Sequence, residues 1–250
     1  AGLDIKEKIA KGVNLNECVI LVPKNKQVRN ALEILHGLGL PMSSLEALNL
    51  FDQEEAITFL RVLKIINNGY VPSLVLSFFD KLSDIEPLEA HKFFILQNMR
   101  KFTFATFLDK SPTLFEGNNK VDKWIEKLLK WKKDSEENSV QTLVELIGKE
   151  LFNDKEERGK LVSLQEILNT ILELLSKQKE KNPQIKLAEF VSYLERLELY
   201  GENVPLVATS KEGVRVLTMH SSKGQEFDYV WIAHMDERSL NGGKNMGFTL

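Results

Sequence analysis

The sequence predicts an α/β domain interrupted by a large all-helical insertion, and three observations support this fold class. A compact β-branched run, residues 17–23, has the composition of a buried strand. Residues 69–202 show helical spacing of apolar side chains and no strand-like alternation. Strand composition then returns at 214–218 and 228–233. A sheet that opens before a helical block and resumes after it predicts three parts: α/β residues 1–68, inserted helical residues 69–202, and α/β residues 203–250.

The first 68 residues are expected to form a strand, a helix, a short strand and a second helix. Pro23 ends the first strand, because proline cannot donate a hydrogen bond within a sheet. Apolar residues within 27–38 and again within 53–67 recur every three or four positions, which is the spacing of one helical face. Gly39 and Pro41 are expected to close the first of these helices.

The middle block is expected to contain several helices separated by Gly, Asn and Pro. They are predicted at 71–82, 87–107, 121–132, 140–151, 160–180 and 186–200. No fixed period repeats along this stretch, so the block is predicted to be an irregular helical domain and not a solenoid.

Composition excludes several classes of protein. With 43% hydrophobic and 28% charged residues, the chain is neither disordered nor fibrous, and its apolar runs 19–22 and 229–233 are too short to cross a bilayer. The single cysteine, Cys18, excludes a disulfide framework and suits the cytoplasm, with a bacterial cytosol expected. A net charge of −3 leaves no global basic field, so any contact with nucleic acid must come from a local patch.

The segment that carries chemistry is 214–234, VRVLTMHSSKGQEFDYVWIAH. A strand ends at Thr218, and a small polar turn containing Lys223 and Gly224 follows it. Small residues let backbone N–H groups approach a phosphate, the lysine supplies positive charge, and Glu226 offers an acceptor for a sugar hydroxyl. Taken alone, such a turn is more often a simple connection, and His220 a structural histidine at a strand end.

The whole string is more specific than its parts. Ten consecutive positions, 218–227, closely resemble motif V of the UvrD/Rep-type superfamily 1 DNA helicases, with one departure at Gln225, where the family usually has an aliphatic residue. Residues 20–27 look like the strand, turn and helix that open the second RecA-like domain of this family. Residues 233–237 depart from the pattern of many UvrD proteins and leave the RecB/AddA branch open. The chain starts without a methionine and stops just after a strand-like run, so we expect it to be a fragment.

The resemblance implies a fold and a set of roles. The α/β part would be an incomplete RecA-like (P-loop NTPase-type) domain, and the helical block its accessory insertion. Thr218, His220 and Ser221 would face single-stranded DNA. Lys223 and Gly224 would lie beneath the γ-phosphate of ATP, and Glu226 would bind the ribose. One turn would then contact DNA on one side and ATP on the other, and couple the two.

No G-x-x-x-x-G-K-(S/T) phosphate loop occurs in the 250 residues, so the chain alone is expected neither to hydrolyse ATP nor to unwind DNA. ATP and Mg²⁺ would be bound mainly by a first motor domain outside the chain. For the parent, the resemblance implies 3′→5′ translocation and duplex unwinding in repair or recombination. Expected partners are single-stranded and junction DNA, the first RecA-like domain, and a nuclease domain or subunit. The alternatives are a non-catalytic helicase-like binding subunit, and a motor whose insertion is autoinhibitory or binds a partner.

Three further patterns have both a functional and a structural interpretation. The basic segment 120–133 carries Lys123, Lys127 and Lys130, which could contact duplex backbone, beside two tryptophans seven residues apart that could equally form a core stripe. A group of phenylalanines could stack bases but is more typical of core: Phe93, Phe94, Phe102, Phe104 and Phe107. The remaining histidines do not cluster with Cys18, so no metal site is expected.

Overall fold

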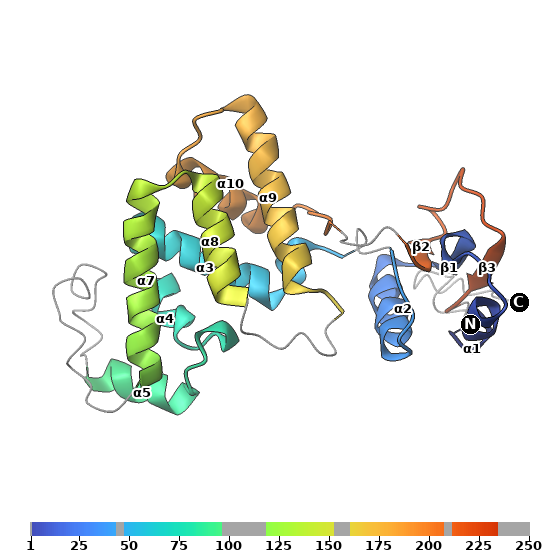
Figure 1. Cartoon of the computed structure of the whole chain (residues 1–250), viewed down its shortest axis with the longest axis horizontal. Coiled ribbons are helices and arrows are strands. Elements are labelled where there is room, and N and C mark those ends of the chain that lie inside the picture. Colours follow the sequence, from blue (N-terminus) through green and yellow to red (C-terminus); the bar gives the residue numbers. More distant parts are fainter. Residues whose placement is uncertain (1, 44–47, 97–118, 153–160, 208–211, 235–250) are drawn as a thin grey trace, which may run out of the picture. The chain divides into compact units, whose positions relative to one another are not determined.

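The computed structural model describes residues 2–43, 48–96, 119–152, 161–207 and 212–234 (Figure 1). The chain forms two compact units. The first, an α/β unit, comprises 1–49, 157–166 and 205–250, and the second, a helical unit, comprises 50–156 and 167–204.

A three-stranded parallel sheet forms the centre of the α/β unit, in the order β2-β1-β3. The strands are β1 (Cys18–Val22), β2 (Arg215–Thr218) and β3 (Tyr229–Ile232). All three confirm the predicted strands. Val22 pairs with Thr218, so the carboxyl ends of β1 and β2 meet at the same edge of the sheet. Cys18 and Val19 are fully buried, as expected for the central strand of a parallel sheet.

Helix α2 (Asn25–Gly37) follows β1 and packs against β1 and β2. Val28, Leu32 and Leu35 are buried, which confirms the predicted apolar face. After the helix, Gly39 takes φ +68, a left-handed conformation that ends the helix and favours glycine. No regular strand is described between α2 and α3, where a short one was expected. The described residues of this stretch form isolated bridges, one of which joins Met42 to Val214.

Helix α1 (Gly2–Ala10), which is followed by the 3₁₀ turn η1 (Leu15–Glu17), was not predicted from the sequence. The helix lies against β3: the Trp231 Nε1–H donates to Asp4 Oδ2 at 2.8 Å, and the Lys8 ammonium lies 4.5 Å from the centre of the Tyr229 ring. Ile5 is the one side chain that the helix buries, so its sequence shows little of the apolar periodicity that predicts a helix.

The second unit is entirely helical in its described residues. Its elements are η3 (Leu50–Asp52), α3 (Glu54–Asn68), α4 (Val71–Ser77), η4 (Lys81–Ser83), α5 (Pro87–Leu96), α7 (Asn119–Glu137), α8 (Val140–Phe152), α9 (Leu164–Lys181) and α10 (Leu187–Leu199). The first three residues of α9 belong to the first unit. Helix α3 packs against α4, α7 and α10, and its buried residues lie on most of its circumference, as in a core helix.

Two predicted helices differ at their ends, one because of a contact with another helix and one because of a local capping pattern. Helix α4 ends at Ser77 instead of continuing to 82, because the following turn places the buried carboxylate of Asp80 against the guanidinium of Arg61 on α3. Burial raises the pKa of Asp80 even beside Arg61. Helix α9 begins at Leu164, where Ser163 and Glu166 form reciprocal side-chain to backbone hydrogen bonds of 3.2 and 2.9 Å.

The aromatic side chains of the helical unit form core. Trp124 and Trp131 on α7 are at most 2% exposed and pack edge to face with ring centres 5.9 Å apart, which confirms the core interpretation of this pair. Phe93 and Phe94 on α5 are also buried, as the core interpretation predicted. Phe102, Phe104 and Phe107 lie outside the described residues, as does the rest of the helix predicted at 87–107. Among the described helices, none is long and apolar enough to span a membrane.

Candidate functional site

The turn that follows β2 is held by a compact set of hydrogen bonds. Thr218, the last residue of β2, is 8% exposed, and its hydroxyl accepts from the Ser221 N–H at 3.1 Å. The two hydroxyls lie 2.7 Å apart. The Ser222 N–H donates to the Thr218 carbonyl at 3.0 Å, and the Gln225 N–H donates to the Ser222 carbonyl at 3.0 Å. These hydrogen bonds define the shape of the turn.

Gly224 and Gln225 close this turn. Gly224 adopts φ +81 and has no heavy atom near the position of an added Cβ, so the backbone conformation and not crowding requires glycine. The Gln225 side-chain amide donates to the Ser221 carbonyl at 3.0 Å. The one residue that departs from the resembled motif therefore contributes a bond to the turn, one that an aliphatic side chain could not make.

The predicted ligand-binding side chains point to solvent, with one exception. His220, Ser221, Lys223 and Glu226 are exposed, whereas Thr218 is buried. Within the described part of the chain, the Lys223 ammonium and the Glu226 carboxylate form no ion pair or side-chain hydrogen bond, and the Gly224 N–H is not used in the turn. The Lys223 ammonium, the Gly224 N–H and the Glu226 carboxylate thus offer two hydrogen-bond donors and one acceptor within four consecutive residues.

The turn lies at the carboxyl edge of the sheet. Its Met219 N–H donates to the Val22 carbonyl, the last of β1, at 3.0 Å, which ties the turn to the central strand. The chain leaves Val22 and enters α2 at Asn25, so the amino end of α2 also lies at this edge of the sheet. Parallel α/β sheets bind ligands beyond the carboxyl ends of their strands, and the candidate residues occupy this position.

Beyond the turn, the chain doubles back to begin β3. Phe227 lies against Arg215, the first residue of β2, with the guanidinium carbon 5.2 Å from the ring centre. Arg215 could not be identified from the sequence, because nothing in the spacing of the residues shows that two side chains twelve positions apart will meet.

The basic segment of α7 belongs to the helical unit, and several of its lysine side chains form ion pairs with acidic residues. Lys130 is bound to Glu150, whose other oxygen accepts from the Trp131 Nε1–H at 2.9 Å. Lys123 is exposed and Lys127 half-buried, and neither has an ion pair among the described residues. The other three lysines have acidic neighbours: Lys120 with Asp84 at 3.3 Å, Lys132 with Glu136 at 3.9 Å and Lys133 with Glu137 at 3.9 Å.

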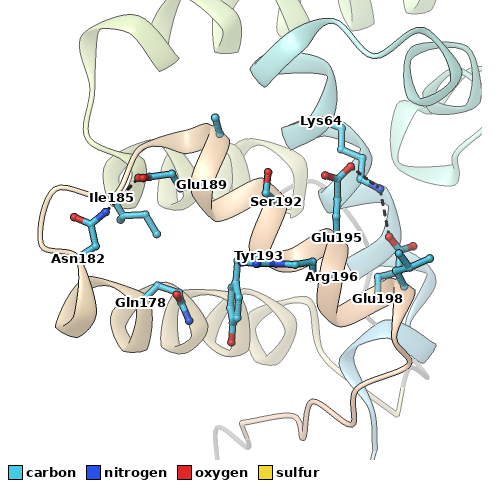
Figure 2. A pocket seen from close by; sticks show the side chains of 12 residues that line it. Lys64, Gln178, Asn182, Ile185, Glu189, Ser192, Tyr193, Glu195, Arg196 and Glu198 are labelled. Atoms are coloured by element: carbon cyan, nitrogen blue, oxygen red, sulfur yellow. Dashed lines mark hydrogen bonds and ion pairs between the residues drawn. The ribbon is translucent and has the colours of Figure 1, made fainter.

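An open groove of about 1180 Å³ runs along α9 and α10 in the helical unit (Figure 2). Lys64 of α3 lies at its end between Glu195 and Glu198, at 3.5 and 3.3 Å. None of the side chains predicted to bind nucleotide or DNA lines this groove.

Cys18 and the histidines provide no reactive or metal-binding cluster. Burial raises the pKa of the Cys18 thiol, which keeps it protonated at neutral pH. No group of His, Cys, Asp and Glu suited to a metal ion is present in the part of the chain that the structure describes.

The fold and site together define an α/β domain with a polar, lysine-bearing turn at the ligand edge of its sheet and a large helical unit. Comparison with known families identifies the class: residues 94–241 match the UvrD-like helicase C-terminal domain. The chain belongs to this family, which confirms the resemblance seen in 218–227.

Known relatives are, by name, A subunits of ATP-dependent helicase/nucleases. The A subunit from Enterococcus faecalis is 28% identical over 247 residues, covering 93% of this chain and 19% of the relative. Those from Listeria innocua and Desulforamulus reducens are 23% and 25% identical, covering 94% and 90% of this chain and 19% of each relative. The chain thus spans about a fifth of the length of these relatives.

Proposed function

We propose that this chain is part of the second motor domain of an ATP-dependent DNA helicase of the helicase/nuclease A-subunit type, and that the turn after β2 couples ATP to DNA. The observation that carries the proposal is the arrangement of His220, Lys223 and Glu226. They are exposed on one hydrogen-bonded turn at the carboxyl edge of a parallel sheet, in a chain of the UvrD-like helicase C-terminal family.

Lys223, Gly224 and Glu226 are proposed to bind ATP. The ammonium of Lys223 and the free N–H of Gly224 suit a phosphate oxygen, and the Glu226 carboxylate suits a ribose hydroxyl. These donors and this acceptor fit one edge of a nucleotide. When bound with Mg²⁺, ATP would supply the free energy of phosphoryl transfer. The first motor domain would bind the metal and most of the triphosphate.

His220 and Ser221 are proposed to contact single-stranded DNA directly. Thr218 is buried and its hydroxyl is bonded to Ser221, so it would act by fixing the Ser221 hydroxyl. Because the same short turn carries both sets of groups, a shift of Lys223 upon hydrolysis would be transmitted to His220 through a few hydrogen bonds.

The domain division is proposed as an α/β motor interrupted by a helical accessory domain. The sequence pattern placed the boundaries at 68/69 and 202/203, whereas the compact units divide near them at 49/50 and 204/205, because α3 packs against α4, α7 and α10 of the helical unit. We therefore propose the first boundary between Asn49 and Leu50. Support comes from the residues on either side of these two points. Asn49 and Pro205 form an antiparallel bridge there. The Leu50 N–H donates to the Val204 carbonyl at 2.8 Å, beside this bridge. Adjacent entry and exit points are what an inserted domain requires.

For the whole protein we propose 3′→5′ translocation on single strands, unwinding in repair or recombination, and action on junction DNA in the bacterial cytosol. A nuclease domain or subunit is proposed as a partner, in keeping with the name of the relatives. The competing proposal is a non-catalytic subunit that uses the same fold only to bind DNA or protein.

Hydrolysis of ATP by the full-length protein, stimulated by single-stranded DNA, tests the proposal. Glu226→Ala is expected to raise the KM for ATP by about tenfold, because a hydrogen bond to a charged acceptor is lost, with kcat nearly unchanged. Glu7→Ala, which removes an exposed carboxylate from α1, is the matched control and is expected to behave as wild type. Absence of DNA-stimulated hydrolysis in the wild-type protein would favour the non-catalytic subunit.

A further inference from the structure

The segment between the turn and β3 has few contacts in the structure. Glu226 and Phe227 make no hydrogen bond within the described part of the chain, whereas nearly every residue of the preceding turn is bonded. Gly224, immediately before Gln225, also has a conformation that only glycine adopts at low cost. Backbone hydrogen bonds therefore fix the turn but not the position of Glu226.

A side-chain contact, between Phe227 and Arg215, holds this segment where backbone hydrogen bonds do not. The guanidinium carbon lies 5.2 Å from the ring centre, within the range of a cation–π interaction. Both side chains are half-buried, so water competes less with the contact than at an open surface. Arg215 itself is held firmly, because it is the first residue of β2 and pairs with Val19 of the central strand.

We infer that Arg215 is a positioning residue for nucleotide binding: its guanidinium holds Phe227 and thereby sets where the adjacent Glu226 presents its carboxylate. This inference rests on the proposed function, since it assigns Glu226 to the nucleotide. Arg215 itself touches no nucleotide and takes no part in the chemistry. Its effect reaches the ligand through the single peptide unit that joins Phe227 to Glu226.

The residues that flank Glu226 and Phe227 are both anchored to the rest of the unit. Gln225 is anchored to the turn through its side chain and its N–H. Tyr229 begins β3 and pairs with Cys18. Glu226 therefore lies on a short span fixed at both ends, and the Arg215–Phe227 contact is its intermediate support.

A double-mutant cycle in the full-length protein tests the inference by the KM for ATP in DNA-stimulated hydrolysis. Arg215→Ala and Phe227→Leu are each expected to raise this KM by about 2- to 5-fold, the equivalent of one partly exposed cation–π contact, with kcat unchanged. The double variant is expected to be no worse than the worse single variant, because both remove the same contact. Arg215→Lys keeps a cation and is expected to restore part of the affinity. Lys6→Ala, which removes an exposed cation from α1, is the control.

Limited proteolysis supplies a readout that needs no activity, because a protease cuts faster where the chain is less firmly held. In Arg215→Ala, cleavage after Glu226 by a glutamate-specific protease and after Phe227 by chymotrypsin is expected to be several-fold faster than in the wild-type protein, with Lys6→Ala unchanged. Additive KM effects in the double variant, or unchanged cleavage at these two positions, would overturn the inference. If the wild-type protein hydrolyses no ATP, the proposed function fails and the nucleotide role of Arg215 with it, while faster cleavage at Glu226 and Phe227 would still establish the contact as the support of this segment.

Discussion

At the scale of single residues, the shape of the turn depends on Gly224. Its φ of +81 costs an L-residue about 1–2 kcal/mol, and no neighbouring atom adds a steric cost at the Cβ position. Gly224→Ala is therefore expected to speed hydrogen exchange of the β2 amides by about 5- to 30-fold, because the strand is anchored through this turn.

Gly37→Ala provides a matched control for this substitution. Gly37 is the last residue of α2, its φ is ordinary and it also has open space at Cβ. Alanine is a better helix former than glycine, so this variant is expected to keep or slightly slow exchange in the α/β unit. Equal acceleration in both variants would show that added volume, and not backbone conformation, is responsible.

Side-chain chemistry in the turn was predictable from the sequence, but its support was not. The order of small, basic and acidic residues after a strand indicated Lys223 and Glu226, and the resemblance to motif V added His220; all three are exposed at the sheet edge. Thr218, for which the resemblance implied a contact with DNA, is buried and bonded within the turn. Arg215 escaped notice because its partner depends on how the chain reverses after the turn.

At the scale of elements, the basic face of α7 divides into two kinds of lysine. Lys123 and Lys127 have no acidic partner among the described residues, whereas Lys132 and Lys133 each have a glutamate one turn further on. A glutamate in an ion pair competes with a DNA phosphate for its lysine, so an unpaired lysine replaces the counterion of a phosphate at lower cost. We therefore propose Lys123 and Lys127, and not Lys130, as the duplex contacts of this helix.

Salt-dependent binding of duplex DNA by the full-length protein tests this division. The double variant Lys123→Ala/Lys127→Ala is expected to lower the slope of log K against log salt by about 2, one unit for each lysine–phosphate pair removed. Lys132→Ala/Lys133→Ala removes the same charge from the same helix and is expected to leave the slope nearly unchanged. An equal change in both variants would mean that net charge alone matters, and an unchanged slope in the first would remove α7 from the interface.

Element positions were predictable wherever one strong local signal decided them. The strand at β1 follows from its β-branched run, and α9 could have been placed at Leu164 from the Ser163–Glu166 capping pattern. The end of α4 could not be predicted, since it depends on the ion pair of Asp80 with Arg61, which lies nineteen residues away on α3. Periodicity likewise indicated the α3 helix but not its partners, which lie in the helical unit.

At the scale of the whole molecule, the proposed nucleotide site would be only partly formed by this chain. Lys223, Gly224 and Glu226 suit one edge of ATP, but no phosphate loop occurs in the 250 residues to bind the β-phosphate or order Mg²⁺. Positioning of the γ-phosphate against an attacking water needs both. The 250-residue chain alone is therefore expected to release no phosphate from ATP above background, with or without single-stranded DNA.

The measurement is phosphate release by the isolated chain, made beside the full-length protein under the same conditions. Near-ultraviolet circular dichroism of the packed pair Trp124 and Trp131 would first establish that the helical unit is folded, and hydrogen-exchange protection of β1 would do so for the α/β unit. Phosphate release by the folded chain that is lost in Glu226→Ala would contradict the expectation. It would mean that residues of this chain position the γ-phosphate and the attacking water without a phosphate loop or a second domain.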